Sequence, residues 1–391
     1  MPHIDITSKD ILEGASFRLV EAIIRWDDHT CSSGWGRDAL LETARWKAIN
    51  EAIERHSFTR LPSVVRAAAQ SLQDWLHPDR LIRYSNEQHV EAALCPFHVS
   101  DIKHWALMRP VLSDVPASPV HVLADFLCSP RAFSAEDRER LLVYASTSGC
   151  ASADSIDLAI LRATMELIER DAFMRHWFSQ ASGRSIDLKT LTPDLLQRVR
   201  ALEQYGCEVG LQWLDLGVHP TWLAWAQHEG QHFTSIGSAS GIDGMVAVNA
   251  AFNELETAAL SRAEGIPVEM MRPEAVQSPA DHGALYATPE YFRRADTLLR
   301  GAEGHHIFVD ALRSFEASPN EIYMRLARHG HMPYWIDLSV PGCREILGGI
   351  SIHTVRVIAP DLIPMVFGYG RMPLGMDAWG RTGVDDLHPF T

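Results

Sequence analysis

Lysine is scarce in this chain of 391 residues, and its placement excludes one common phosphate-binding motif. The sequence holds only four lysines, and none of them follows a glycine: Lys9, Lys47, Lys103 and Lys189. The G-x-x-x-x-G-K-[ST] loop, in which backbone N–H groups and a lysine cradle phosphates, therefore cannot occur. If the protein handles a nucleotide, other side chains must contact its phosphates.

Paired cysteines, long apolar runs and excess basic charge are also lacking. The six cysteines stand at least 22 residues apart, so no C-x-x-C pair supports a zinc ribbon or a dithiol centre. We see neither an apolar stretch of about 18 residues that would span a membrane nor the pattern of a signal peptide. Fifty acidic residues oppose 35 basic ones, for a net charge of -15. We therefore expect a reduced, cytoplasmic protein with no nucleic-acid or membrane partner.

Helical and strand-like patterns are mixed along the chain and predict an α+β fold. The expected helices are 38–58, 63–77, 155–180, 192–205, 245–264, 288–301 and 318–329. The expected strands are 119–127, 207–215, 220–227, 231–238, 333–339 and 353–359. Turn signals within 207–238 favour an antiparallel meander. Residues 271–287 are expected to form a loop, and 360–391, rich in glycine and proline, an extended tail.

Two segments of the chain match each other at an offset of 115 residues. Residues 31–58 and 146–173 each contain a Ser-Gly pair whose glycine lies 17 residues before an E-x-x-E-R motif. The first motif begins at Glu51 and the second at Glu166, each inside an expected long helix. Several matches at one offset indicate a duplicated unit.

The repeated motif suggests a cation site. Residues three apart lie on one face of a helix, so each copy presents two carboxylates side by side: Glu51 with Glu54, and Glu166 with Glu169. Mg²⁺ favours oxygen ligands and commonly joins a few carboxylates to phosphate oxygens. Arg55 and Arg170, which follow the motifs, would pair with phosphates or hold the glutamates in place. The alternative is a solvated helix face with local ion pairs.

Two other features invite a catalytic interpretation. Cys150 follows Gly149 just ahead of an expected helix, where a thiolate would be stabilised, although a small packing residue is the simpler interpretation. The segment 237–241 (GSASG) has alanine where a nucleophile elbow has serine, so we interpret it as a strand-to-helix turn.

Four stretches together resemble the YcaO family. Residues 149–171 resemble that family's second glutamate helix, and residues 36–55 its first. Residues 355–360 (VRVIAP) are similar to a segment that carries a nucleotide-contacting arginine. Residues 386–391 (DLHPFT) resemble the proline-containing tail of azoline-forming members. The resemblance runs from about residue 30 to the end, and implies a single YcaO-type catalytic unit over residues 1–391.

The resemblance implies an ATP-dependent cyclodehydratase. In such enzymes a Cys, Ser or Thr side chain of a precursor peptide attacks the preceding amide, whose oxygen is then phosphorylated by ATP and eliminated. The implied cofactors are ATP and Mg²⁺, with the metal held by Glu51, Glu54, Glu166 and Glu169. The candidate nucleotide-binding residues are Arg37, Ser33, Arg55, Arg170, Arg356 and Asp154. The candidate catalytic residues lie in the tail: His388, Pro389 and Thr391, whose terminal carboxylate would serve as a base.

Several positions depart from the family pattern. Arg37 stands where lysine is usual, Leu158 and Arg162 where many members have an acid and a glutamine, and Thr257 where glutamine is frequent. Leu158 cannot bind a cation, and Asp154 or Asp157 is a candidate substitute. These differences keep one alternative open, a non-catalytic scaffold subunit that binds peptide. A second alternative is another chemistry of the same family, backbone thioamidation, from which the H-P-F tail distinguishes azoline formation only weakly.

The resemblance also implies partners. These are a ribosomal precursor peptide, a separate leader-binding or ubiquitin-activating-like protein, and an FMN-dependent azoline dehydrogenase. We also expect homodimer contacts.

Overall fold

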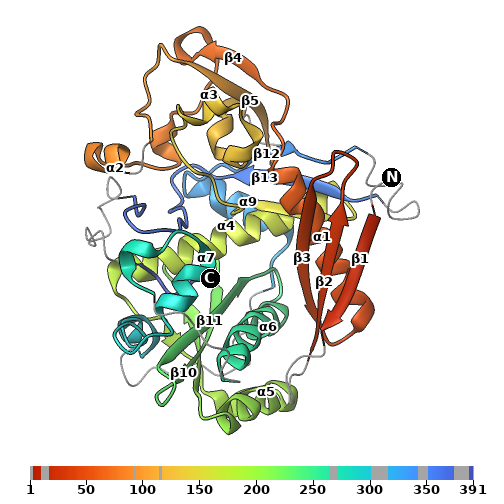
Figure 1. The fold of residues 1–391 in the computed structure, drawn as a ribbon, viewed down its shortest axis with the longest axis vertical. Coiled ribbons are helices and arrows are strands. Elements are labelled where there is room, and N and C mark those ends of the chain that lie inside the picture. Colours follow the sequence, from red (N-terminus) through yellow and green to blue (C-terminus); the bar gives the residue numbers. More distant parts are fainter. Residues whose placement is uncertain are drawn as a thin grey trace. The chain divides into compact units, whose positions relative to one another are not determined.

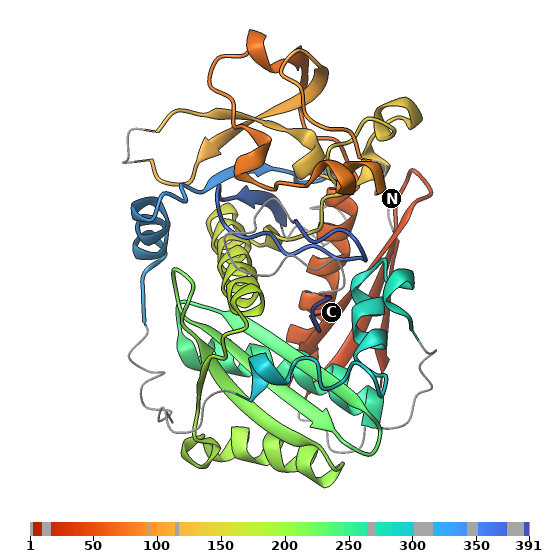
Figure 2. The same cartoon turned by 90° about the vertical axis from the view of Figure 1, so that its left-hand side faces the viewer.

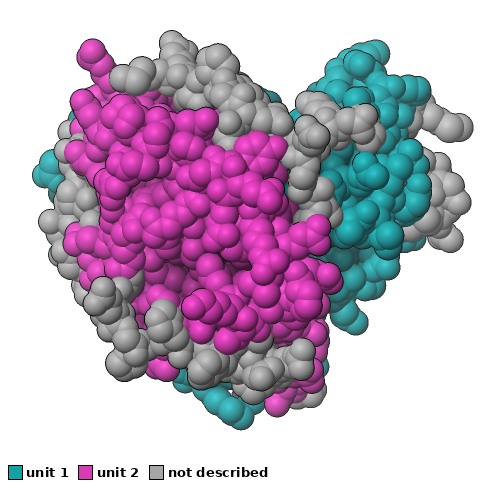
Figure 3. Space-filling view, turned by 90° about the horizontal axis from the view of Figure 1, so that it is seen from below, with its two compact units in different colours: residues 1–10, 17–167, 323–362 teal, residues 11–16, 168–322, 363–391 magenta. Residues whose placement is uncertain are grey.

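The structure, a computed structural model, describes residues 3–9, 17–91, 94–113, 117–263, 271–300, 316–341, 351–373 and 387–390. The chain divides into two compact units, each built from several segments (Figure 3). Unit 1 comprises residues 1–10, 17–167 and 323–362, and unit 2 comprises residues 11–16, 168–322 and 363–391. The boundary at residue 167 falls within the long helix α4 (Ile156–Ser179).

One part of unit 1 is a three-stranded antiparallel sheet covered by helix α1 (Leu41–Phe58) (Figure 1). Its strands run in the order β1 (His3–Lys9), β2 (Arg18–Arg25) and β3 (Cys31–Asp38). The helix lies so close to β3 that a Cβ atom at Gly34 would stand 2.3 Å from the carbonyl oxygen of Ala48. Glycine on the strand and alanine on the helix therefore permit this contact.

The other part of unit 1 is a six-stranded antiparallel sheet. Its strands are β4 (Val65–Ala68), β5 (Ile102–Pro110), β12 (Tyr334–Asp337), β13 (His353–Ile358) and β7 (Cys150–Ala153) in spatial order, with β6 (Val120–Leu123) paired to β5. The first half of α4 packs on this sheet, since Ile160 and Ala163 share a core cluster with Val355 and Val357. Each repeat helix thus packs near the strand that precedes it. Helix α1 follows β3, which contains a Ser-Gly pair, and α4 follows β7, which begins directly after the other Ser-Gly pair.

Unit 2 is built on a four-stranded antiparallel sheet with side chains buried on both faces. Its strands run in the order β11 (Phe233–Ser240), β10 (Thr221–His228), β9 (Glu208–Leu214) and β8 (Arg184–Ser185). Along β10, Trp222 contributes to the core with helices α5 (Pro193–Gln204) and α6 (Gly244–Ala263). The next residue, Leu223, contributes to the opposite core with the second half of α4 and Phe390. Figure 2 shows α5 running along one face of this sheet.

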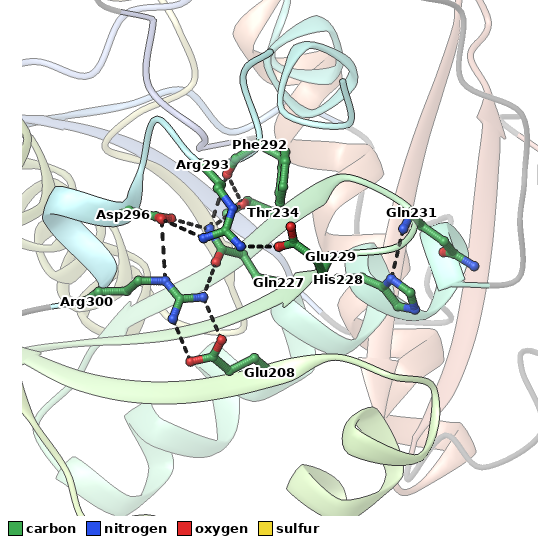
Figure 4. A network of polar contacts seen from close by, with 10 residues as sticks. All are labelled: Glu208, Gln227, His228, Glu229, Gln231, Thr234, Phe292, Arg293, Asp296 and Arg300. Carbon is green, nitrogen blue, oxygen red and sulfur yellow. Dashed lines mark hydrogen bonds and ion pairs between the residues drawn. The ribbon is translucent and has the colours of Figure 1, made fainter. Parts of the chain in front are cut away.

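A network of charged and amide side chains attaches the segment around α8 (Asp296–Leu299) to the sheet of unit 2 (Figure 4). Arg300 donates hydrogen bonds of 2.8 and 2.6 Å to the two carboxylate oxygens of Glu208 and one of 2.6 Å to Gln227. The buried Gln227 in turn donates to Asp296 over 2.6 Å. Arg293 pairs with Glu229, and the neighbouring Phe292 carbonyl accepts from Thr234.

The remaining elements are short. The helices are α2 (Asn86–Glu91), α3 (Ala135–Arg138), α7 (Pro279–Leu285) and α9 (Pro319–Arg328). The 3-10 turns are Ala69–Ser71, Pro78–Arg80, Ala124–Phe126, Pro130–Ala132, Leu188–Thr190 and Pro273–Ala275. None of the helices in the described ranges has the length and apolar character needed to cross a bilayer.

The structure corrects four expectations about local structure. Of the strand expected over 119–127, only Val120–Leu123 is observed, and Ala124–Phe126 form a 3-10 turn. Residues 63–77 do not form a helix: β4 pairs with β5, and the next residues form a 3-10 turn. Residues 271–287 are not all loop, because Ser278 and Asp281 form a capping box that starts α7. Residues 288–301 are helical only over Asp296–Leu299. In the tail, the described residues 361–373 and 387–390 contain no helix or strand, as expected.

Candidate functional site

The first repeat holds Glu51 through the strand before it. The backbone N–H of Trp35 on β3 donates a 2.5 Å hydrogen bond to Oε2 of Glu51 on α1. Arg55 donates to the other oxygen, Oε1, over 2.7 Å and to the carbonyl oxygen of Ser33 over 3.2 Å. The structure therefore brings Ser33, Glu51 and Arg55 together, with the arginine engaged by the glutamate.

The second repeat holds Glu166 in the same way. The N–H of Gly149, directly before β7, donates a 2.8 Å hydrogen bond to Oε2 of Glu166 on α4. Gly149 has a φ of 80°, and a Cβ atom there would lie 2.5 Å from the carbonyl oxygen of Val357. Only glycine suits this position, both in backbone conformation and in space. In this copy the glycine of the Ser-Gly pair supplies the backbone donor to the first glutamate of the motif, whereas in the first copy the donor is Trp35, the residue after the pair.

Arg356 connects the glutamates of the two repeats within unit 1. Its side chain on β13 is 6% exposed and donates 2.8 Å hydrogen bonds to the carbonyl oxygens of Ser146 and Phe126. Burial lowers the pKa of this guanidinium, while the negative charges of Glu166 and Glu54 raise it. One predicted phosphate-contacting arginine therefore lies within electrostatic reach of one carboxylate from each repeat helix.

Glu169, the fourth glutamate, lies in unit 2. Its Oε1 accepts a 2.6 Å hydrogen bond from the hydroxyl of Ser238 on β11. Arg170 beside it approaches the sulfur of Met365 at 3.5 Å and lies over the ring of Phe390 at 5.4 Å. Arg170 therefore contacts the C-terminal part of the chain.

A third strand–helix unit, which the sequence analysis missed, repeats this geometry in unit 2. The N–H of Ser238 on β11 lies 3.4 Å from Oε2 of Glu254 on α6, as Trp35 N–H contacts Glu51. A Cβ atom at Gly237 would stand 2.2 Å from the carbonyl oxygen of Ala251. Gly237 precedes Glu254 by 17 residues, the same interval as in the other two copies. That interval could have indicated the third copy in the sequence. The copy lacks the E-x-x-E-R motif, however, because Thr257 stands in place of the second glutamate.

The same observation corrects the interpretation of residues 237–241 as a turn. Gly237 to Ser240 belong to strand β11, and only Gly241 lies beyond its end. The small residues here serve the close approach of α6 to the strand.

Two other predicted nucleotide-binding residues lie at element ends. Arg37 is half-buried on β3, and Lys47 donates to its carbonyl oxygen over 3.0 Å and to Asp38 over 2.8 Å. Asp154 is exposed between β7 and α4.

The structure argues against a catalytic thiol at Cys150. The residue lies within strand β7 and not at a helix N-terminus, since α4 begins only at Ile156. Its side chain is buried, and burial raises its pKa well above the ordinary range, with Glu54 and Glu166 adding to the rise. A thiol that stays protonated is a poor nucleophile.

The tail residues His388 and Pro389 are buried in unit 2. The ring of His388 lies between His282 and Phe390, and its Nε2 is 3.0 Å from the carbonyl oxygen of Val366. Burial lowers its pKa well below the usual range, so the ring is neutral. Thr391 lies outside the described residues.

The donor set fits a magnesium–nucleotide complex better than a bare metal site. Within the described ranges, no group of three or more His, Cys, Asp or Glu side chains is placed to hold a metal ion. Mg²⁺ is usually held by one or two carboxylates together with substrate phosphates, so a three-ligand cluster is not required. Two predicted phosphate-contacting side chains, Arg37 and Arg356, each have a buried Nε without a hydrogen-bond partner among the described residues. These donors fit an anionic ligand.

Unit 2 also contains a cavity of about 490 Å³ between α5 and the sheet. It is lined by apolar side chains such as Leu196, Val199, Leu211 and Trp225, with Lys189 and Arg200 among the polar ones. The predicted glutamates and arginines do not line it. It therefore has no part in the arrangement described above.

Comparison with protein families gives one match over most of the chain. The matching family is described as YcaO cyclodehydratase, ATP- and Mg²⁺-binding, and the match covers residues 35–363. Among curated proteins, no relative matches.

Solved structures share the fold at low sequence identity. A heterocyclase in complex with substrate and cofactor superposes with a TM-score of 0.74 at 16% identity, over 99% of this chain and 54% of that one. YcaO from Methanopyrus kandleri bound with AMPPCP and Mg²⁺ gives 0.64 at 17%, over 90% and 84%. The E. coli microcin synthetase McbBCD complex gives 0.70 at 12%, over 99% and 96%. The chain spans about half the length of the first of these.

Proposed function

Because this chain belongs to the YcaO family, we propose that it is an ATP-dependent peptide cyclodehydratase. The proposed substrate is a ribosomal precursor peptide. A Cys, Ser or Thr side chain of that peptide attacks the preceding backbone carbonyl, and the ring loses the carbonyl oxygen. The product is a thiazoline or an oxazoline.

One observation carries this proposal: Arg356 is buried on β13, hydrogen-bonded to the backbone, and within electrostatic reach of Glu54 and Glu166 in unit 1. The two glutamates come from different repeat helices, and both act electrostatically on the same buried arginine. Carboxylates from two matched helices thus lie beside a positively charged guanidinium. The carboxylates suit a bound metal ion, and the guanidinium suits the phosphates that such an ion carries. We assign Glu51, Glu54, Glu166 and Glu169 to Mg²⁺.

The remaining roles follow from the contacts of each side chain. When bound, Mg²⁺–ATP would supply the phosphoryl group that turns the amide oxygen into a leaving group. Arg37 and Arg356 would donate to the phosphates through their unpartnered Nε atoms. Arg55 already bridges Glu51 and Ser33, so its role is to hold the first glutamate of the motif in place. Asp154 and Asp157 are the acids near the position of Leu158, and either would take the place of the acid that Leu158 lacks.

We assign the tail to the same reaction. Pro389 and Thr391 would bring the terminal carboxylate to the substrate as a base, while the buried His388 would anchor the segment. Arg170 supports this assignment, because it joins the motif on α4 to Phe390. On this proposal the two compact units act as one catalytic unit over residues 1–391.

The proposed partners extend beyond the peptide. McbBCD is described as a complex, and one solved form has pro-MccB17 bound. By analogy, we propose a separate leader-binding or ubiquitin-activating-like protein, an FMN-dependent dehydrogenase acting on the azolines, and homodimer contacts. The requirement for ATP and the free state of the five described cysteines support a cytoplasmic location.

The test is a mass measurement on the precursor peptide. The protein is incubated with its genomic partner, the peptide, Mg²⁺ and ATP. Loss of water that depends on ATP supports cyclodehydration. Exchange of oxygen for sulfur would instead identify thioamidation, and an unchanged peptide without ATP consumption would identify a scaffold.

Matched variants test the site within the same assay. Glu166→Gln keeps an oxygen to accept from Gly149 but removes the charge, so it should retain the fold and lose ATP-dependent activity. The control is Glu42→Gln, which alters an exposed acid on α1 that pairs only locally with Arg45. Full activity of Glu166→Gln would refute the metal-ligand assignment.

A further inference from the structure

The last described residues of the chain are held inside unit 2 by a small set of hydrogen bonds. We call residues 387–390 the C-terminal segment. Tyr286 donates from its hydroxyl to the carbonyl oxygen of Leu387 over 2.8 Å. His282 Nδ1 lies 2.7 Å from the carbonyl oxygen of His388. Both Tyr286 and His282 are buried, so these bonds are shielded from water.

His282 contacts two separate parts of the tail at once. Its Nδ1 faces the carbonyl oxygen of His388, which can only accept, so this nitrogen carries the proton. Its Nε2 accepts a 3.1 Å hydrogen bond from the N–H of Gly368. One neutral tautomer satisfies both contacts, and burial lowers the pKa of this ring, which keeps it neutral. The ring also stacks on His388 with the centroids 4.5 Å apart.

The segment held in this way ends on the motif helix. Phe390 packs edge-on against Phe173 of α4, with ring centroids 5.1 Å apart. Its ring also lies 5.4 Å from the guanidinium of Arg170. Arg170 directly follows Glu169, so the penultimate residue of the chain is fixed beside the turn of α4 that carries this glutamate.

We propose that His282 is a positioning residue for the reaction, which acts through the C-terminal segment. It clamps the carbonyl of His388 to the backbone at Gly368, and so fixes Phe390 next to Arg170, the neighbour of Glu169. This inference rests on the proposed catalytic role of the tail. His282 itself touches no reacting atom: its removal should lower kcat and leave the KM for ATP unchanged.

The variants of His282 separate its two hydrogen bonds. His282→Leu removes both. His282→Asn keeps an amide N–H near the place of Nδ1 and so retains the donor to His388, whereas His282→Gln keeps an acceptor near the place of Nε2. The proposal expects kcat to fall about 100-fold in His282→Leu, the scale of a misplaced catalytic group. His282→Asn should recover part of this loss, and His282→Gln should recover less.

A matched control is His176 on α4. It is buried in the same unit and uses the same tautomer: Nδ1 faces the carbonyl oxygen of Ala181 and Nε2 accepts from Asp215 and Leu216. His176→Leu should therefore cost comparable stability without acting through the tail.

The decisive measurement combines each variant with removal of residues 389–391 and compares the residual slow turnover of the shortened chains. If His282 acts through the segment, His282→Leu should change kcat by less than about twofold in the shortened chain. His176→Leu should have the same effect in the full and shortened chains. Equal effects of His282→Leu in both backgrounds, or an unchanged kcat in the full chain, would overturn the proposal.

Amide hydrogen exchange provides a readout that does not depend on activity. His282→Leu should speed exchange at Gly368 and Phe390, and His176→Leu should not. If truncation leaves activity intact while exchange responds as expected, the clamp exists but the catalytic role of the tail is wrong. If truncation abolishes activity while exchange in His282→Leu is unchanged, the assignment of His282 is wrong and the function of the tail stands.

Discussion

The hydroxyl of Ser238 donates a 2.6 Å hydrogen bond to Oε1 of Glu169. Its own N–H lies 3.4 Å from Oε2 of Glu254, so one serine joins a glutamate of the E-x-x-E-R motif to the third strand–helix unit. Groups that orient a ligand side chain commonly affect metal binding nearly as much as the ligand does.

The first prediction concerns this serine. Ser238→Ala should lower ATP-dependent activity and Mg²⁺ affinity about 10- to 100-fold, because Glu169 loses the donor that orients it. The fold should survive, since alanine fits a site that already holds a small buried side chain. Isothermal titration with Mg²⁺ and a non-hydrolysable nucleotide provides the measurement.

The control for that experiment is Ser240→Ala on the same strand. Its hydroxyl donates to the carbonyl oxygen of Pro220 over 2.8 Å and has no contact with Glu169 in the structure. Equal affinity in Ser238→Ala and the unaltered chain would contradict the role of the serine.

The second prediction concerns the close contact of β3 with α1. Gly34→Ala would place a methyl group 2.3 Å from the backbone oxygen of Ala48 and from the nitrogen of Ala52. Backbone atoms of a packed helix cannot move aside as the end of a flexible side chain can. We therefore expect the free energy of unfolding to fall by about 3 kcal/mol. Urea denaturation measures it.

Gly330→Ala is the comparison for Gly34→Ala. Gly330 has a φ of 88° and nothing within 4 Å of a Cβ atom, so this variant adds backbone strain without a clash. We expect a loss of about 1 kcal/mol. If both variants lose the same free energy, steric contact is not what requires Gly34.

The long repeat helices were predictable from the sequence, and shorter elements were less so. The expected helices 38–58 and 155–180 are observed as Leu41–Phe58 and Ile156–Ser179, because a helical pattern sustained over many residues is a strong signal. The family match confirms the family, and the solved structures confirm the α+β fold. The helix predicted over residues 63–77 was wrong. Strand β4 within this segment pairs with β5, and local composition does not reveal such a long-range contact.

In the candidate site, the contacts between strands and helices were predictable where a motif repeated, and contacts between residues distant in sequence were not. Glu51 and Glu166 were found because both the glycine and the E-x-x-E-R motif recur. Glu254 was missed because its copy keeps the glycine at the same interval but has Thr257 in place of the second glutamate. His282 carries no sequence signal, since its role depends on meeting His388, 106 residues later.

The third prediction concerns cysteine reactivity. Cys31 is exposed, whereas Cys150 is buried and burial holds its pKa well above the ordinary range. Iodoacetamide at mildly alkaline pH should therefore modify Cys31 in the native protein and reach Cys150 only after unfolding. Peptide mass spectrometry over a time course follows both sites. Native-state labelling of Cys150 at the rate of Cys31 would show that its thiolate is accessible.

The fourth prediction concerns acid stability. His388 is buried against His282 and near the charge of Arg170, and burial, then the interaction with His282, lowers its pKa well below its ordinary value of 6.5. A histidine whose pKa is lowered in the folded state binds its proton mainly after unfolding. Its contribution to stability is therefore present above about pH 6.5 and is lost as the pH falls below that value. His282, whose pKa is also lowered, adds to the same loss.

His388→Gln isolates the contribution of one ring to this acid sensitivity. Glutamine keeps an N–H near the place of Nε2, which faces the carbonyl oxygen of Val366, and His388 Nδ1 has no hydrogen-bond partner among the described residues to lose. Because glutamine does not titrate, the free energy of unfolding should fall less steeply below pH 6.5, by up to about 1.4 kcal/mol per pH unit. Urea denaturation at several pH values measures the two slopes. Identical slopes in the variant and the unaltered chain would mean that protonation of His388 is not what unfolding in acid depends on.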